Sequence, residues 1–222
     1  MVRLHQFPLC PFSRKVRLAL AEKGLAFELV LEQPWIRREA YLDVNPAGQT
    51  PGLARDGAPP LADSCAIVEW ADEVGTGPAL IGSDPELRAE ARRLSAWLDG
   101  KFYAEAGVLL LQERMLKRLV ERKPPDSGAL RRAAKALESH LDYFEWLLDT
   151  RRWLAGAQLT IADLAAAAHL SVADYLSALD WTGHPSVKAW YMALKSRPSM
   201  RPLLAERVEG LFPPGHYDKL DF

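Results

Sequence analysis

The hydrophobic pattern changes near residue 80, and this change limits the possible folds more than any other feature. Before it, short apolar segments alternate with turns, whereas after GTGPALIGSDPE the apolar residues follow a helical period almost throughout. Strands mixed with helices, followed by helices alone, predict an α/β domain joined to an all-α domain. We therefore expect domains over residues 1–78 and 84–208, followed by an extended tail over residues 209–222.

The individual elements are predicted from the same pattern. VRLHQF and FELVL are expected to be strands on either side of a helix, PFSRKVRLALAEKG, which Gly24 ends. GLARDGAPPLA is expected to form two short strands joined by a turn at Asp56 and Gly57, and a helix is predicted from about Ser64 to Val74. Later in the chain the helical period extends over four segments, residues 84–122, 127–150, 160–179 and 185–207.

The composition is that of an ordinary globular protein, in which 49% of the 222 residues are hydrophobic. Lys and Arg together number 28 against 29 for Asp and Glu, so no positive field favours nucleic acid. No apolar run is long enough to predict insertion into a membrane. The start, MVRLHQFPLC, lacks the apolar core of a signal peptide, and two cysteines suit a reducing compartment. We expect a cytoplasmic protein with no metal site.

The stretch LCPFSRKVRLAL places Cys10 at the predicted start of a helix. The free backbone amides and the positive end of the helix dipole lower the pKa of a thiol there and favour thiolate chemistry. The residue three positions later is Ser13, so a Cys-x-x-Cys redox pair is excluded. Cys10 is therefore a candidate nucleophile, and the alternative is a turn thiol without chemistry.

Four motifs, taken in order, resemble those of the glutathione-transferase superfamily. CPFSRKVRLALAEKGLAFE resembles its first βαβ unit, and NPAGQTP resembles the loop that leads to its cis-proline. LADSCAIVEW resembles its acidic-Ser glutathione motif, and WLAGAQLTIADLAAAAHL resembles the signature of its helical domain. The resemblance covers nearly the whole chain. It implies the glutathione-transferase fold, an N-terminal thioredoxin-like α/β domain followed by an all-α helical domain.

The resemblance implies glutathione-binding roles for four residues. A cis peptide before Pro51 would turn the N–H and C=O of Thr50 outward, where they could pair with the cysteinyl part of glutathione. Asp63 and Ser64 stand at the start of a predicted helix, whose amides and dipole attract a carboxylate such as that of the γ-glutamyl group. The alternative for Ser64 is a plain helix N-cap.

A catalytic role at the start of the first helix is also implied by the resemblance. Transferases of this superfamily carry a catalytic serine, tyrosine or cysteine in or near this turn, and Cys10-Pro11-Phe12 is most similar to the cysteine-using, omega-type members. Ser13 is the rival, because serine-using members place their hydroxyl at the start of the same helix. The scaffold also hosts proteins that are not enzymes, so the fold alone does not decide activity.

Segments outside the general superfamily pattern resemble a narrower family. RVEGLFPPGHYDKLDF, LEQPWIRREAYLDVNPAG, SAWLDGKF and HLDYFEWLLDTRRWLAG are similar to bacterial division proteins that have the glutathione-transferase fold and bind the tubulin homologue FtsZ. This resemblance implies a homodimeric, non-catalytic adaptor at the division site, which binds FtsZ polymers and regulates cell division and constriction. It implies no required cofactor, with glutathione as a possible ligand.

Two segments are expected to contact the partner. Trp35 is flanked by Pro34 and followed by Arg37 and Arg38, a composition typical of binding hot spots, and the alternative is that Trp35 covers its own domain interface. The tail either folds back on its own domain or presents a docking surface. We expect it to pack only at the edge of the fold and to supply partner contacts from Tyr217, Asp218, Lys219, Leu220, Asp221 and Phe222.

Two functions of different classes remain open from the sequence. The first is the FtsZ-binding adaptor, which we favour because only this function accounts for the tail. The second is a glutathione-dependent transferase or thiol reductase that uses Cys10 or Ser13. A transferase-like scaffold with another partner is a third alternative.

Overall fold

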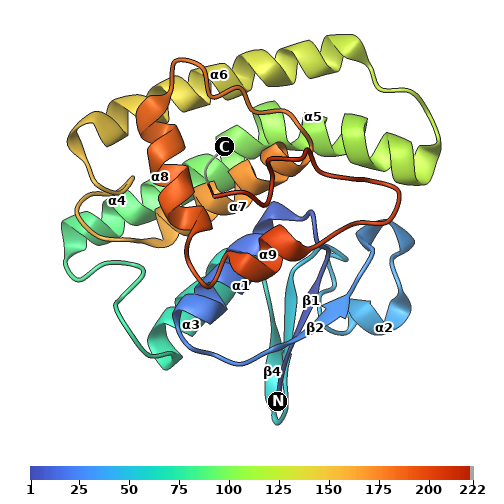
Figure 1. Ribbon diagram of the computed structural model, residues 1–222. Helices are drawn as coiled ribbons and strands as arrows, with labels where there is room; N and C mark the ends of the chain where they lie inside the picture. The colour runs from blue at the N-terminus through green and yellow to red at the C-terminus, as the bar shows by residue number, and fades with distance from the viewer. Residues whose placement is uncertain (221–222) are drawn as a thin grey trace.

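The computed structural model describes residues 1–220, and its first domain is built on a four-stranded sheet (Figure 1). β1 (Val2–Gln6) runs parallel to β2 (Glu28–Leu31) and antiparallel to β3 (Gly52–Arg55). β3 pairs antiparallel with β4 (Ala58–Ala62), so the strand order is β2-β1-β3-β4. At the tight turn between β3 and β4, Gly57 has a φ of 73°, a conformation that glycine adopts without steric cost. The four predicted strands are confirmed.

Helices lie against the sheet of this first domain. α1 (Pro11–Glu22) packs against α3 (Ser64–Val74), and the predicted limits of α3 are confirmed. The loop from β2 to β3 carries a 3-10 turn, η1 (Pro34–Ile36), and a short helix, α2 (Glu39–Leu42). Tyr41 of α2 stacks on His5 of β1, with ring centroids 5.3 Å apart. Leu4, the preceding residue on the strand, points to the opposite face and is fully buried.

The second domain is helical. α4 (Pro85–Ala96), the π-helical segments η2 (Trp97–Gly107) and η3 (Leu111–Glu121), and the short α5 (Val108–Leu110) follow one another without a break. α6 (Ser127–Thr150), α7 (Ile161–Tyr175), α8 (Pro185–Lys195) and α9 (Arg201–Ala205) complete it.

Two predicted helices are shorter than expected. The helix predicted to reach residue 179 ends at Tyr175, because the chain turns at Ser177, which has a φ of 55°. The helix predicted over residues 185–207 is divided into α8 and α9. The break contains Pro198, which cannot donate a backbone hydrogen bond within a continuous helix.

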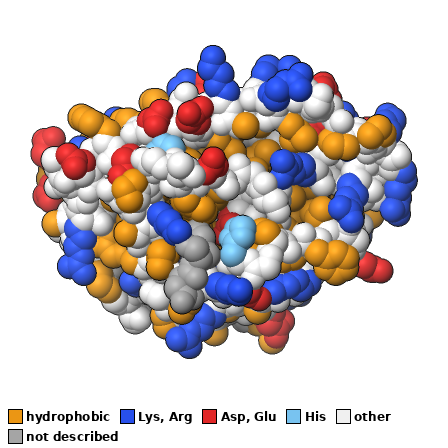
Figure 2. Space-filling model, turned by 45° about the horizontal axis from the view of Figure 1, so that its top comes forward, with side chains coloured by type: hydrophobic (Ala, Val, Ile, Leu, Met, Phe, Trp, Pro, Cys, Tyr) orange, Lys and Arg blue, Asp and Glu red, His pale blue; other side chains and the backbone are white. Residues whose placement is uncertain are grey.

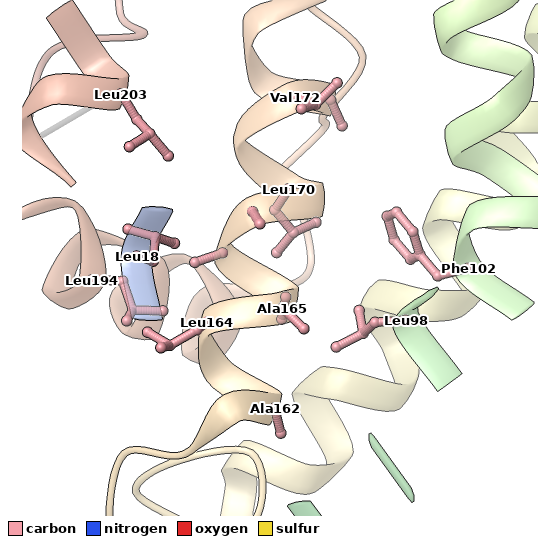
Figure 3. Packing of buried hydrophobic residues seen from close by; sticks show 14 of the residues in the cluster. Leu18, Leu98, Phe102, Ala162, Leu164, Ala165, Leu170, Val172, Leu194 and Leu203 are labelled. Carbon is pink, nitrogen blue, oxygen red and sulfur yellow. The ribbon is translucent and has the colours of Figure 1, made fainter. Parts of the chain in front are cut away.

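α7 is the centre of the core, and every one of its residues is buried. Figure 3 shows Leu18 of α1, Leu194 of α8 and Leu203 of α9 on one side of this helix. On its other side lie Leu98 and Phe102 of η2 (Figure 3). The alanines of α7, residues 165–168, are fully buried and let these neighbours approach its backbone closely.

Three cations of α1 are buried at the seam between the domains, with side chains at most 3% exposed. The Arg14 Nη1 donates to Ser171 Oγ at 2.8 Å and to Tyr217 Oη at 2.9 Å. Lys15 forms an ion pair with Asp99 of η2. Arg17, the third cation, pairs with Glu206 at 2.7 Å. Each of these contacts joins the thioredoxin-like domain to a later part of the chain.

The tail folds back on its own chain, which corrects one expectation. Tyr217 is 0% exposed and packs edge-on against Tyr175, with ring centroids 5.1 Å apart. The prediction that Tyr217 is a partner anchor on an edge-packed tail is therefore wrong. Its ring is buried in the core, and its hydroxyl accepts a hydrogen bond from Arg14 at the seam between the domains. Asp218 is exposed and pairs with Arg207 at 2.7 Å.

The described part of the chain contains neither a membrane-spanning helix nor a cluster of metal-binding side chains, and its two cysteines are not joined. Across residues 1–220, no helix has the length and the apolar character that crossing a bilayer requires. The same residues hold no group of three or more His, Cys, Asp or Glu side chains placed to bind a metal ion. Cys10 and Cys65 are free thiols.

We predict that Tyr217 contributes strongly to stability. Tyr217→Phe should lower the free energy of unfolding by about 1–3 kcal/mol, because the Arg14 guanidinium loses a buried hydrogen-bond partner. Tyr217→Ala should cost about 3–5 kcal/mol, since it also leaves a cavity. Urea unfolding measures both values. Phe212→Ala is the matched control, because this aromatic residue of the same tail is 74% exposed and its loss should change little. An unchanged midpoint for both Tyr217 variants would contradict the prediction.

We also predict an acid-sensitive contribution from Asp99. Burial raises the pKa of this carboxyl, but the hydrogen bond from His169 and the charge of Lys15 outweigh burial and lower the pKa from 3.8 to about 2. A depressed pKa stabilises the fold above the unfolded-state value, and that stability is lost as the pH falls from about 4 to about 2. Asp99→Asn should remove about 2 kcal/mol at neutral pH and flatten this acid limb of the unfolding curve.

Unfolding measured at a series of pH values tests the Asp99 prediction. Asp218→Asn is the control, because its exposed ion pair with Arg207 should contribute little. An Asp99→Asn protein that keeps the wild-type acid limb would show that another group produces it.

Candidate functional site

Two adjoining cavities lie beside the start of α1. The larger has a volume of about 420 Å³ and a mostly apolar wall that includes Trp35, Leu111 and Met115. The smaller, of about 290 Å³, has a more polar wall. Both are lined by Ala47, Gln49 and Thr50, so the loop before β3 separates a polar compartment from an apolar one.

Cys10 lines the larger cavity at this dividing loop. It ends the turn after β1, where its N–H donates to Phe7 O at 2.9 Å, and its own carbonyl accepts the first helical bond from Arg14 N at 3.0 Å. The residue is therefore the N-cap of α1, as expected. Its thiol is half-buried and donates to Thr50 O at 3.3 Å. A thiol in this place can meet a molecule that occupies either compartment.

Ser13 faces the interior. Its side chain is 0% exposed, and its Oγ has no hydrogen-bond partner among residues 1–220. Neither cavity is lined by this residue. The prediction that Ser13 competes with Cys10 as the nucleophile is therefore wrong, because one turn of helix directs its hydroxyl into the core.

The loop before β3 is fixed by hydrogen bonds to a single carbonyl. Tyr41 Oη and Asn45 Nδ2 both donate to Gln49 O, at 2.5 Å and 2.6 Å. The next peptide, Thr50–Pro51, is cis, which confirms the expected isomer. Thr50 and Pro51 both line the smaller cavity, so the backbone that the resemblance assigned to glutathione borders the polar compartment.

The start of α3 forms the far wall of the smaller cavity, which is lined by Asp63 and Ser64. Asp63, not Ser64, is the N-cap of this helix, and its Oδ1 accepts from Cys65 N at 2.8 Å and from Ala66 N at 3.1 Å. The alternative that Ser64 is the cap is therefore wrong. Asp63 has a φ of 74°, which is rare for a residue with a side chain and typical of functional sites.

Burial keeps the phenols around this site protonated. It raises the pKa of Tyr41 to about 12 and also raises the pKa of Tyr103. Tyr103 of η2 lines the larger cavity together with Cys10, and its ring packs edge-on against Phe12 with centroids 4.7 Å apart. Tyr103 can therefore donate a hydrogen bond in the cavity but cannot act as a base near neutral pH.

The four residues assigned to glutathione by resemblance are brought together by the fold. Thr50, Pro51, Asp63 and Ser64 line one small cavity, and Cys10 lines the adjoining apolar cavity and donates to Thr50 O. A ligand made of a polar tripeptide joined to an apolar group would match the polar cavity and the adjoining apolar cavity. These residues fit the γ-glutamyl and cysteinyl parts of glutathione, which would supply a second thiol next to Cys10.

Trp35 lies at the junction of the larger cavity with a further groove of about 750 Å³. The residue is half-buried, and its ring packs edge-on against Phe7 with centroids 5.0 Å apart. This groove is formed by both domains. The thioredoxin-like domain contributes Pro8, Leu31 and Trp35, and the later chain contributes Leu119, Val120, Arg122 and residues 207–210.

The other residues predicted to bind a partner are not gathered in one cavity. Arg38 is partly exposed and pairs with Glu32 at 2.6 Å, outside the groove. Lys219 and Leu220 are exposed. Asp221 and Phe222 lie outside the described residues. The structure therefore places Trp35 beside residues 207–210, where the helical domain meets the tail, rather than beside the end of the tail.

The sequence analysis missed a cluster of charged groups and a thiol at the domain seam. Lys15, Asp99 and Cys65 line a separate cavity of about 440 Å³, and Asp99 Oδ1 lies 3.2 Å from His169 Nε2. These residues come from α1, η2, α3 and α7, so no local motif connects them. One feature of the sequence could have indicated this cluster: Arg14, Lys15 and Arg17 lie close together on a helix whose other residues are mostly apolar.

Known families match both domains of the chain. Residues 9–74 match the glutathione S-transferase N-terminal domain, and residues 127–193 match the glutathione S-transferase C-terminal domain. FtsZ-localized protein A of Caulobacter vibrioides is 48% identical over 222 residues, which are 99% of this chain and 97% of that protein. Glutathione S-transferase 3 of Zea mays is 32% identical over 216 residues, 92% of this chain and 93% of that one.

Solved structures agree with these matches. A glutathione S-transferase from Rhodospirillum rubrum superposes with a TM-score of 0.97 at 47% identity, covering all of both chains. FzlA from C. crescentus superposes with a TM-score of 0.96 at 48% identity, covering 100% of this chain and 99% of that one. With both domains matched in order and relatives aligned along almost the full length, this chain belongs to the glutathione S-transferase family.

Proposed function

We propose that this protein is a homodimeric adaptor that binds FtsZ polymers at the division site and regulates bacterial cell division and constriction. One observation carries the proposal: the chain is 48% identical, over 99% of its length, to a protein named for its localisation with FtsZ. The identity to a plant glutathione transferase over a similar length is 32%. The higher value favours the division protein's role over that of the plant transferase, while the solved structure of a Rhodospirillum rubrum glutathione S-transferase, at 47% identity, keeps transferase activity open as a second function.

The groove beside Trp35 is the surface that we assign to FtsZ. It offers an aromatic ring and exposed apolar side chains, with Leu31 60% and Val120 43% exposed. An aromatic anchor with neighbouring arginines is the composition of an interface hot spot. Arg122 is exposed at the rim and has no carboxylate within ion-pair distance among the described residues. Glu209 adds one acid to the same rim.

Basic side chains extend this surface along the helical domain. Arg122 also lines a cavity of about 540 Å³, together with Arg114, Arg118 and Lys123. Figure 2 shows Lys and Arg side chains spread over one face of the molecule, between patches of hydrophobic side chains. A surface of this kind favours an acidic partner through faster association, and its contribution falls with added salt.

We predict that Trp35→Ala lowers affinity for FtsZ polymers by about 2 kcal/mol or more, since the ring is the central aromatic group of the groove. Arg122→Glu should weaken binding most at low salt, because it reverses an exposed charge. Co-sedimentation with polymerised FtsZ at two salt concentrations measures both effects. Trp146→Ala is the matched control, because this tryptophan is 68% exposed on α6, outside the groove.

The control should bind like the wild type, and light scattering on the same preparations tests the proposed dimer. Wild-type binding by Trp35→Ala would move the FtsZ contact away from the groove. No co-sedimentation of the wild-type protein would overturn the proposed function itself.

A second function is favoured by the position of Cys10. Its thiol lines the apolar cavity and donates to Thr50 O, a residue that also lines the polar cavity, so it is near a ligand held there, as a glutathione-dependent transferase or thiol reductase requires. Glutathione bound in the smaller cavity would supply the co-substrate thiol. Cys10 would then provide the protein's nucleophile, the Thr50 backbone would orient the ligand, and Tyr103 would donate a hydrogen bond.

We predict that Cys10→Ala separates the two functions. The variant should co-sediment with FtsZ like the wild type, because Cys10 does not line the groove beside Trp35. The same change should abolish any thiol-transfer activity with glutathione. Cys65→Ala is the control for that activity, since Cys65 lies in a different cavity. A folded Cys10→Ala protein that no longer binds FtsZ polymer would link the thiol to the adaptor role and contradict this separation.

A further inference from the structure

A second thiol lies within a cluster of charged groups at the domain seam. Cys65 is the second residue of α3, and its Sγ lies 3.4 Å from Lys15 Nζ and 3.4 Å from Asp99 Oδ2. Lys15 is 1% exposed, so its amino group is fixed beside the sulfur. Cys65 itself is exposed, and the cavity of about 440 Å³ that it lines gives small molecules access to the sulfur.

We propose that Cys65 and Lys15 form a covalent cross-link when the protein meets a peroxide. In the first step, the Cys65 sulfur attacks hydrogen peroxide, the O–O bond breaks, and the products are a sulfenic acid and water. The sulfur is oxidised and the peroxide is reduced, so no further oxidant is needed.

In the second step, the Lys15 nitrogen attacks the oxidised sulfur. An S–N bond forms and the S–O bond breaks. The ammonium of Lys15 gives up two protons: one leaves with the hydroxide as water, and the other passes to solvent. Asp99 Oδ2 contacts both reacting atoms and is placed to accept the first proton. The product is a sulfenamide between side chains, analogous to the sulfenamide that a sulfenic acid forms with a backbone nitrogen.

Burial and the charged groups around the cavity together determine the pKa of the Cys65 thiol, and hence how the reaction of Cys65 with peroxide depends on pH. Burial raises the pKa of the Cys65 thiol, while the charge of Lys15 opposes that rise. Because the thiolate is the nucleophile, cross-linking should be faster at higher pH. The charged groups that face the thiol or line the cavity come from α1, α3 with its cap, α4 and η2: Lys15, Asp63, Glu69, Arg92 and Asp99.

The cross-link would change the seam between the domains. Lys15 would lose its charge to the S–N bond, and Asp99 would keep only the hydrogen bond to His169. A covalent tie within the thioredoxin-like domain, between α1 and α3, would thus replace an ion pair to the helical domain. Peroxide would therefore alter how firmly the two domains are joined.

Mass spectrometry of the full-length Cys10→Ser protein tests the proposal. This background removes a Cys10–Cys65 disulfide, which would cause the same loss of two hydrogens. After treatment with hydrogen peroxide, we expect the intact monomer to lose two hydrogens and to regain them with dithiothreitol. Peptide mapping should find Cys65 joined to Lys15, with trypsin no longer cutting after Lys15. Oxygen adducts alone, or no change in mass, would overturn the proposal.

Lys15→Arg in the same background is the matched control. Arginine keeps a positive charge beside Asp99 but is a far weaker nucleophile, so oxidation should stop at products that have gained oxygen. If Lys15→Arg still loses two hydrogens, another group captures the sulfur and the assignment to Lys15 is wrong. Should this variant fail to fold, the peptide map of the Cys10→Ser protein decides the question alone.

Discussion

The joining of the two domains depends on three buried cations of one helix. Burying a charge is costly unless a partner compensates it, and removing that partner costs more than the pair contributes. Arg14, Lys15 and Arg17 of α1 each have at least one partner outside the thioredoxin-like domain, on η2, on α7 or in the chain after α9. Separating the first domain from the second would therefore leave these buried charges without the partners that compensate them.

The candidate sites follow from that arrangement. The same helix begins at Cys10, so fixing α1 against the helical domain also fixes the thiol opposite Tyr103 of η2. The groove beside Trp35 has one wall from each domain, and a shift at the seam would change its width. The two cavities beside Cys10, the groove beside Trp35 and the Cys65 cavity are thus all bounded by residues on or next to this seam.

Local sequence patterns predicted the local structure well. Alternation of apolar residues located the four strands, and turn residues located the ends of α1 and α3, because short-range rules govern both. The gathering of Thr50, Pro51, Asp63 and Ser64 followed from resemblance rather than from physics. Ser13 could not be excluded from sequence, because the direction of a side chain on a helix depends on what packs against it. The burial of Tyr217 could not be foreseen either, since Arg14 and Tyr175, its partners, are remote in sequence.

The tail connects the partner groove to the domain seam. Residues 207–210 line the groove, and Tyr217, a few residues later, accepts a hydrogen bond from Arg14 Nη1 in the core. Arg207, itself a groove residue, pairs with Asp218, the residue after Tyr217, so the two ends of this segment are joined by an ion pair. A partner that moved residues 207–210 would also strain the chain that leads to Tyr217, whose position is fixed by its buried hydrogen bond with Arg14 of α1. The energy of that movement would therefore depend on this buried contact. If a partner binds at the groove as proposed, its binding is expected to be coupled to the packing of the two domains, although none of the residues that line the groove is a buried cation.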